Sequence, residues 1–374
     1  MNNQNKKKNI ILFAAIALFA IAAVAYLVVP EGQRTAFLPE GQELAIDTPI
    51  DYEAGDNSTE SDNVIDMAKT AIPAKVVNPA AKNMSAWLWE APDSFTKAQL
   101  DKMFAIAKAE KITMIYVRMD DYIDLYSIKD TKIRTQKVGA FDAAAKQFIT
   151  TAAAYGIKVQ ALGGDTGWSE LAQREYAYKV FDGVIKYNKA NPSAQFVGIQ
   201  YDVEANNDPA YKIDKTKTLK NYLDFAKIMV DKSKANGNFT IGFAIPFWYD
   251  NENNNGVIVD WGGKGSKPVG YHLFDILNGT NGYAVLMDYR NYAAGTDGSI
   301  LNAKKELDYV VANKLTTKII IGQETTDVLP RKITFFDKSK AIFKAEAAKI
   351  VAAFSSNLNF GGIAVHHLPS YIDL

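Results

Sequence analysis

The strongest constraint on the fold of this chain is the regular alternation of apolar runs with amphipathic segments from residue 84 onward. Each run is continuous, which is typical of strands buried on both faces of a parallel sheet. The eight runs are MSAWLW (84–89), ITMIYVRM (112–119), IKVQALGG (157–164), FVGIQYDVE (196–204), FTIGFAIPFW (239–248), YAVLMDYR (283–290), KIIIGQET (318–325) and FGGIAVHH (360–367). Segments with helical periodicity lie between them, such as TKAQLDKMFAIAKAEK, FDAAAKQFITTAAAYG and LKNYLDFAKIMVDKSKANG. Eight strands and seven intervening helices predict an α/β protein with a (β/α)8 TIM-barrel fold.

An open, doubly wound sheet is the structural alternative. It is disfavoured because no Gly-rich phosphate loop follows the first run, and because eight repeats suit a closed barrel better. The sequence ends seven residues after His367, so we expect no full-length helix after the eighth strand.

The first 80 residues differ in composition from the rest. Three lysines (6–8) precede an uncharged run, IILFAAIALFAIAAVAYLVV, which is long enough to span a bilayer as a helix. We expect residues 1–30 to be a transmembrane anchor with the lysines in the cytoplasm; a cleaved signal peptide ending near AVA (23–25) is the alternative. Residues 31–80 are polar and irregular, which predicts a flexible tether. The barrel (81–374) is then held at the membrane outside the cytoplasm, or secreted if the segment is removed.

Composition excludes several classes of site. The absence of cysteine excludes disulfides, thiolate metal sites and a cysteine nucleophile. The formal net charge of zero provides no basic face for nucleic acid. Three histidines leave little material for a His-based zinc site, and Asp120, Asp121 and Asp124 match no calcium-loop spacing. We therefore predict no metal and no cofactor.

Carboxylates follow the fourth run at the point where a barrel presents its reacting groups. Because strand side chains alternate, Gln200, Asp202 and Glu204 share one face. Two neighbouring carboxylates repel each other, which raises the pKa of at least one and suits it to act as a general acid. The structural alternative is that either acid caps a helix or pairs with Arg118 or Arg290.

Aromatic and polar side chains follow the other strands. Sugar rings stack on aromatic side chains while carboxylates act on the glycosidic oxygen, so this mixture is typical of a carbohydrate site. The candidate substrate-binding residues are Trp89, Arg118, Asp120, Asp165, Trp168, Gln200, Trp248, Arg290, His366 and His367.

The order of these features resembles the family 18 glycoside hydrolases, the chitinase-like barrels. The resemblance rests on the Gly-Gly turn in QALGGDTGW, on part of an Asp-x-x-Asp-x-Asp-x-Glu motif in the fourth run, and on LMDYR in the sixth. It implies that Glu204 is the proton donor, that Asp202 positions the substrate N-acetyl group, and that Tyr289 assists it.

The sequence departs from the family pattern at four places. Val197 and Gln200 stand where the first two motif aspartates belong, and Arg290 stands where an aspartate follows the tyrosine. His366 or His367 occupies the region of the family's eighth-strand Trp.

The resemblance implies substrate-assisted hydrolysis of an N-acetylated oligo- or polysaccharide, in which the acetamido oxygen attacks the anomeric carbon and no protein nucleophile is needed. A second enzymatic hypothesis makes Glu324 the nucleophile and Glu204 the acid/base, with carboxyl groups about 5–5.5 Å apart. A non-catalytic glycan-binding barrel is the alternative from another class, and a barrel acting on a non-sugar substrate is a third.

Overall fold

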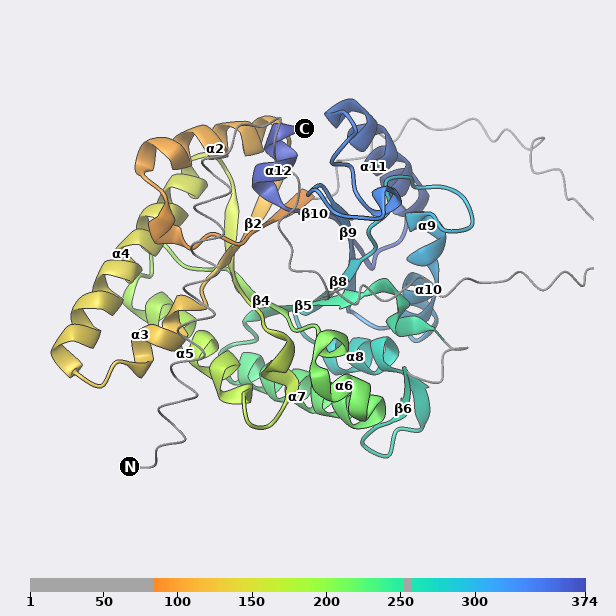
Figure 1. The fold of residues 1–374 in the computed structure, drawn as a ribbon, viewed down its shortest axis with the longest axis horizontal. Coiled ribbons are helices and arrows are strands. Elements are labelled where there is room, and N and C mark those ends of the chain that lie inside the picture. Colours follow the sequence, from red (N-terminus) through yellow and green to blue (C-terminus); the bar gives the residue numbers. More distant parts are fainter. Residues whose placement is uncertain (1–83, 252–256) are drawn as a thin grey trace, which may run out of the picture. The chain divides into compact units, whose positions relative to one another are not determined.

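The computed structural model describes residues 84–251 and 257–374 and contains a closed barrel of eight parallel strands (Figure 1). The neighbours around the barrel follow the order β1-β10-β9-β8-β5-β4-β3-β2. The strands are β1 (Met84–Leu88), β2 (Ile112–Arg118), β3 (Lys158–Gly163), β4 (Gly198–Asp202), β5 (Thr240–Pro246), β8 (Tyr283–Met287), β9 (Lys318–Glu324) and β10 (Phe360–His366). All eight predicted strands are therefore confirmed, as is closure of the sheet.

The predicted anchor and tether lie outside the described residues. Within the described part of the chain, no helix is both long and apolar enough to cross a membrane.

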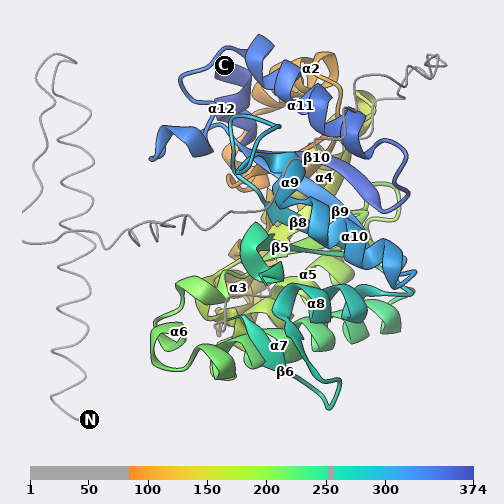
Figure 2. The same ribbon diagram turned by 90° about the vertical axis from the view of Figure 1, so that its right-hand side faces the viewer.

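Helices surround the strands on the outside of the barrel (Figure 2). They are α2 (Lys97–Ala109), α3 (Asp121–Ser127), α4 (Thr131–Ala154), α5 (Arg174–Ala190), α6 (Pro209–Ile213), α7 (Lys215–Ala235), α8 (Val269–Leu277), α9 (Ser299–Asn302), α10 (Lys304–Ala312), α11 (Lys340–Phe354) and α12 (Leu368–Asp373). The helix α4 begins earlier than the predicted stretch because Asp130 Oδ1 accepts the N–H of Ile133 and caps it there.

A short hairpin before α8 was not predicted. Its strands β6 (Ile258–Asp260) and β7 (Ser266–Pro268) are antiparallel. Gly262, Gly263 and Gly265 have positive φ in the connecting turn, a backbone conformation that glycine adopts without strain. The sequence WGGKGS is the local signal that identifies this turn.

The barrel interior contains polar side chains that bond to one another. The indole N–H of Trp87 donates to Gln200 Oε1, and Gln200 Nε2 lies 3.4 Å from the Tyr283 hydroxyl. That hydroxyl donates in turn to Gln160 Oε1 at 2.6 Å. All four side chains are buried, so this ladder satisfies polar groups that would otherwise be costly inside the barrel.

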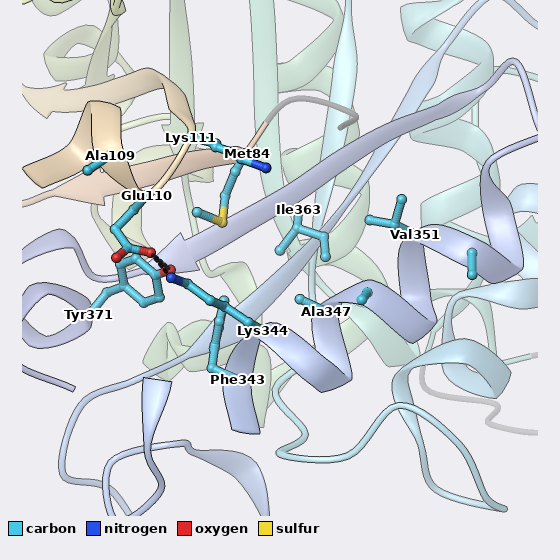
Figure 3. A pocket seen from close by; sticks show the side chains of 12 residues that line it. Met84, Ala109, Glu110, Lys111, Phe343, Lys344, Ala347, Val351, Ile363 and Tyr371 are labelled. Atoms are coloured by element: carbon cyan, nitrogen blue, oxygen red, sulfur yellow. Dashed lines mark hydrogen bonds and ion pairs between the residues drawn. The ribbon is translucent and has the colours of Figure 1, made fainter. Parts of the chain in front are cut away.

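The last strand is followed by only a short helix, as predicted. The six-residue α12 lies beside α2 and α11 (Figures 1 and 2). A mainly apolar cavity of ≈ 370 Å³ lies between the end of α2 and one face of α11 (Figure 3). Lys344 bonds to Glu110 at 2.6 Å at its edge, and Tyr371 of α12 donates to the same carboxylate. The slot that a full eighth helix fills in a complete barrel is therefore only partly covered by the described residues.

Candidate active site

The Gly163–Gly164 turn allows two carboxylate-bearing segments to approach β3 closely. A Cβ on Gly164 would lie 2.2 Å from the carbonyl oxygen of Asp202, and a Cβ on Gly163 would lie 2.8 Å from Asp120 Oδ1. Real Cβ atoms do not tolerate such contacts, so only glycine fits at these positions. Asp120 also accepts a hydrogen bond from the Gly164 backbone. The turn thus packs the ends of β2, β3 and β4 against one another.

Asp202 and Glu204 form an acid pair at the end of β4. Asp202 Oδ1 is buried and has no hydrogen-bond partner. Burial, together with the charge of Glu204, raises the pKa of Asp202 to about 7. Burial also raises the pKa of Glu204, an effect that the nearby His366 partly opposes. Both acids therefore retain a proton at higher pH than ordinary carboxyls, which is the property predicted for a general acid.

The structure does not favour the capping and pairing alternative for these acids. Glu204 precedes a short 3₁₀ helix but makes no side-chain cap bond, and its Oε2 accepts instead from Asn207 Nδ2 at 2.7 Å. Arg118 lies 3.3 Å from Asp121. Arg290 bonds to its own neighbour's carbonyl and to a surface carboxylate, that of Asp297, at 2.7 Å. Both arginines therefore use their charge elsewhere.

Tyr289 lies just beyond β8 and faces the acids. Burial and the charges of Glu324, Asp202 and Glu204 raise the pKa of its phenol far above the usual range. Its ring centroid is 6.0 Å from that of His366. The structure thus gathers the three residues implied by the family resemblance, Asp202, Glu204 and Tyr289, at one end of the barrel.

Glu324 ends β9 and differs from the acid pair in its bonding. Its Oε1 accepts from the Thr325 N–H at 2.7 Å, the Thr326 N–H at 2.6 Å and the Thr326 hydroxyl at 2.7 Å. Its Oε2 lies 2.7 Å from His366 Nδ1. Burial alone raises the pKa of this carboxyl, but the bonds and charge of His366 and the bonds from Thr326 lower it below the usual value. Glu324 is therefore held as a carboxylate with both oxygens occupied.

The two histidines at the end of β10, His366 within it and His367 just after it, face different neighbours. The ring of His366 lies between Glu324 and the indole of Trp89, and 5.9 Å from the ring of Trp87. His367 bonds through Nδ1 to Ser370 at the start of α12. Burial and the charge of His366 lower the pKa of His367. Of the pair, only His366 is directed toward the acids.

Several other predicted residues form a second polar pocket of ≈ 380 Å³ beside this site. It is lined in part by Arg118, Asp120, Asp165 and Trp168. Burial raises the pKa of Asp120 to about 7. Asp165 Oδ1 accepts the N–H of Gly167 at 2.8 Å and so caps the following 3₁₀ helix. Gly164, which also lines this pocket, packs against the backbone of Asp202 and so places the pocket next to the acid pair.

Three predicted substrate contacts gain no support from their placement. Gln200 is fully buried in the interior ladder, below the strand ends. Trp248 packs its ring edge-on against Tyr249, and Arg290 stacks on Phe247. Residue type suggested contact with sugar, but each of these side chains contacts other side chains of the protein.

Reasoning from the strand ends did not predict the bonding partners of the acids. Asn207 lies three residues after Glu204, and Thr326 lies two residues after Glu324. A polar side chain within three residues of each acid is the local signal in the sequence for both. Among residues 84–251 and 257–374, no three His, Asp or Glu side chains form a group suited to a metal ion.

A scan against protein-family models finds no match, and a search of curated proteins finds none either. Among solved structures, a family 18 chitinase from Cycas revoluta in complex with (GlcNAc)3 is similar at 10% identity and a TM-score of 0.46, covering 78% of this chain and 96% of that one. A family 18 chitinase from Pseudoalteromonas aurantia gives 11% identity and 0.45, with 78% and 97% covered. A β-amylase catalytic domain from Paenibacillus polymyxa gives 10% and 0.45, with 78% and 94% covered.

Proposed function

We propose that this chain is a glycoside hydrolase acting on an N-acetylated glycan, with Glu204 as general acid and with Asp202 and Tyr289 holding the acetamido group. The observation that supports it most is the acid pair at the end of β4, whose pKa values are raised by burial while Asp202 Oδ1 has no internal partner. A buried, unsatisfied carboxyl oxygen is costly unless a ligand bonds to it. The acetamido N–H is such a ligand.

The proposed reaction balances without a protein nucleophile. Protonated Glu204 gives its proton to the glycosidic oxygen while the acetamido oxygen attacks the anomeric carbon, which yields the free leaving alcohol and a cyclic oxazolinium ion. Asp202 accepts the acetamido N–H and offsets the positive charge of this intermediate. Glu204, now a carboxylate, then takes a proton from water as the water opens the ring. The product is the N-acetylated sugar, and Glu204 is again protonated.

The bonding of Glu324 bears on the paired-carboxylate hypothesis. A nucleophile needs a free oxygen directed at the anomeric carbon, whereas Glu324 accepts three donors on one oxygen and a histidine on the other. Attack by Glu324 would break these bonds in a buried setting. The geometry therefore favours substrate assistance over a Glu204/Glu324 pair.

One observation favours a non-catalytic glycan-binding barrel as a second candidate. Gln200, a neutral amide, occupies the interior position below Asp202 and is bonded to Trp87 and Tyr283. An amide cannot exchange a proton with Asp202 as an aspartate could. A binding protein retains the sugar contacts without needing that exchange.

The site of action is proposed to lie outside the cytoplasm, with residues 1–30 as anchor or as cleaved signal. Protease added to intact cells should digest the barrel if it is anchored outside. Recovery of an uncut barrel, released only on lysis, would overturn this proposal.

The test of function is hydrolysis by the purified full chain of chitin, peptidoglycan and neutral polysaccharide oligomers. Glu204→Gln and Glu324→Gln are compared, with Glu175→Gln as matched control because that glutamate is exposed on α5. We expect turnover of N-acetylated oligomers only, lost in Glu204→Gln and retained in the control. Comparable loss in both active-site variants supports the paired carboxylates. Binding without turnover on any oligomer overturns the hydrolase and leaves the binding barrel.

A further inference from the structure

Two hydrogen bonds define the protonation state of His366. The indole Nε1–H of Trp89 donates to His366 Nε2 at 3.1 Å, and His366 Nδ1 lies 2.7 Å from Glu324 Oε2. An indole N–H can only donate, so Nε2 must present its lone pair. The single proton of the neutral ring is then on Nδ1, directed at Glu324. A protonated ring would place an N–H against the N–H of Trp89.

From this geometry we propose that Trp89 is a positioning residue: its indole N–H locks His366 in the neutral Nδ1–H form and thereby keeps an additional positive charge away from the Asp202/Glu204 pair. The inference rests on the proposed function for its consequence, since it explains how Glu204 stays protonated for acid catalysis. It gives Trp89 a task different from the sugar stacking that its residue type suggests.

The surroundings of His366 make its charge matter. The ionisable groups around it come from the ends of several strands and are Asp202, Glu204, Tyr289, Glu324 and His367, with Glu90 beside His367. A charged His366 lowers the pKa of both Asp202 and Glu204. With the ring neutral, that influence is absent and both acids keep their protons to higher pH.

Two other neighbours of the acid pair cannot supply a positive charge. The interior neighbour Gln200 is a neutral amide engaged by Trp87 and Tyr283. Glu324 is a carboxylate that accepts hydrogen bonds on both of its oxygens. The imidazole of His366 can be neutral or positively charged, and Trp89 contacts it directly.

Imidazole ¹⁵N NMR on the full chain tests the inference, because the protein has only three histidines. At pH 8 we expect His366 to show one tautomer, with its proton on Nδ1. Trp89→Phe keeps an aromatic ring and removes the donor, so at any one pH the fraction of His366 rings with a proton on both nitrogens should be larger than in the unaltered chain. Trp261→Phe is the matched control, since Trp261 packs 5.8 Å from His272 and should change only that residue's signals.

Two results would overturn the inference: a proton on Nε2 in the unaltered chain at pH 8, or an unchanged doubly protonated fraction of His366 in folded Trp89→Phe. If that variant does not fold, replacing Trp89 by benzothienylalanine removes the N–H and keeps the shape, and the same rise in the doubly protonated fraction is expected. The tautomer of the unaltered chain supports or refutes the inference by itself.

The pH dependence of hydrolysis separates this inference from the proposed function. In Trp89→Phe the alkaline limb of the rate profile should move to lower pH, because a charged His366 lowers the pKa of Glu204. If His366 carries its proton on Nδ1 but the chain hydrolyses no glycan, the inference about Trp89 stands and the proposed hydrolase activity does not. If the chain hydrolyses glycans but His366 does not carry its proton on Nδ1, the proposed activity stands and the inference about Trp89 does not.

Discussion

Asp202 and Glu324 are both acids at the mouth of the same barrel, yet their environments shift their pKa values in opposite directions. Asp202 Oδ1 has no partner, and burial with the charge of Glu204 raises the pKa of Asp202 to about 7. Glu324 is as deeply placed, but its donors bring its pKa below the usual value. Position at a strand end does not determine the charge of an acid; burial, nearby charges and the hydrogen bonds offered to it do.

The difference divides the tasks at the mouth. Glu324 is a carboxylate that orients His366, while Glu204, whose pKa is raised by burial, is the proposed proton donor and Asp202 the proposed acceptor of the acetamido N–H. Each of the following predictions replaces one of these acids, or one of its hydrogen-bond donors, and so tests the difference between them.

The largest effect is expected for Glu204→Gln. Loss of a general acid should lower kcat by about 10²–10⁴-fold on natural oligomers, with little change in binding. Substrates whose leaving group is an acidic phenol need no proton and should lose far less. Steady-state kinetics on both substrate types measures this, and an equal loss on both would contradict an acid role.

Asp202→Asn should change the pH dependence of stability. The pKa of Asp202 is raised from 3.8 to about 7, so its contribution is fully present below about pH 4 and is lost as the pH rises through 7. The free energy of unfolding should therefore fall less between pH 4 and 8 in the variant, by on the order of 3 kcal/mol. Urea unfolding across this range measures it. An unchanged slope would show that Asp202 is not the buried proton carrier.

Glu324→Gln replaces the carboxylate whose two oxygens both accept hydrogen bonds. Because a charge-assisted hydrogen bond to His366 is lost, stability should fall by about 1.5–3 kcal/mol, while kcat should fall by about tenfold at most if Glu324 only orients. Thermal unfolding and kinetics on the same samples measure both. A loss of kcat as large as that of Glu204→Gln would instead identify a nucleophile.

The smallest effect is expected for Thr326→Val, which removes one donor to Glu324 and leaves the backbone N–H. Because the pKa of Glu324 is lowered in the folded state, its ionised form stabilises the fold, and this stabilisation is lost as the pH falls through the pKa of Glu324 in the folded chain. One donor fewer should shift acid unfolding to slightly higher pH and cost about 1 kcal/mol. Thr135→Val, on the exposed face of α4, is the control and should leave the acid limb in place.

The sequence predicted the barrel well because its signals are local and repeated. Continuous apolar runs identified all eight strands, and the fourth run placed Asp202 and Glu204 at the end of β4. The same reasoning did not predict the state of each acid, since that depends on donors from other strands and loops, such as His366 on Glu324. The burial of Gln200 was missed for a similar reason: Trp87 and Tyr283 are far from it in sequence.

The interior hydrogen-bonded ladder also affects how protons reach the acids. It consists of Trp87, Gln200, Tyr283 and Gln160. Side-chain amides and an indole do not release their hydrogens near neutral pH, so the ladder blocks proton transfer through the barrel interior beneath the acids. Protons gained or released during a catalytic cycle must then pass through the open mouth. Substrate and protons therefore enter through the same open end of the barrel. A sugar bound there separates the acids from bulk solvent until the product leaves.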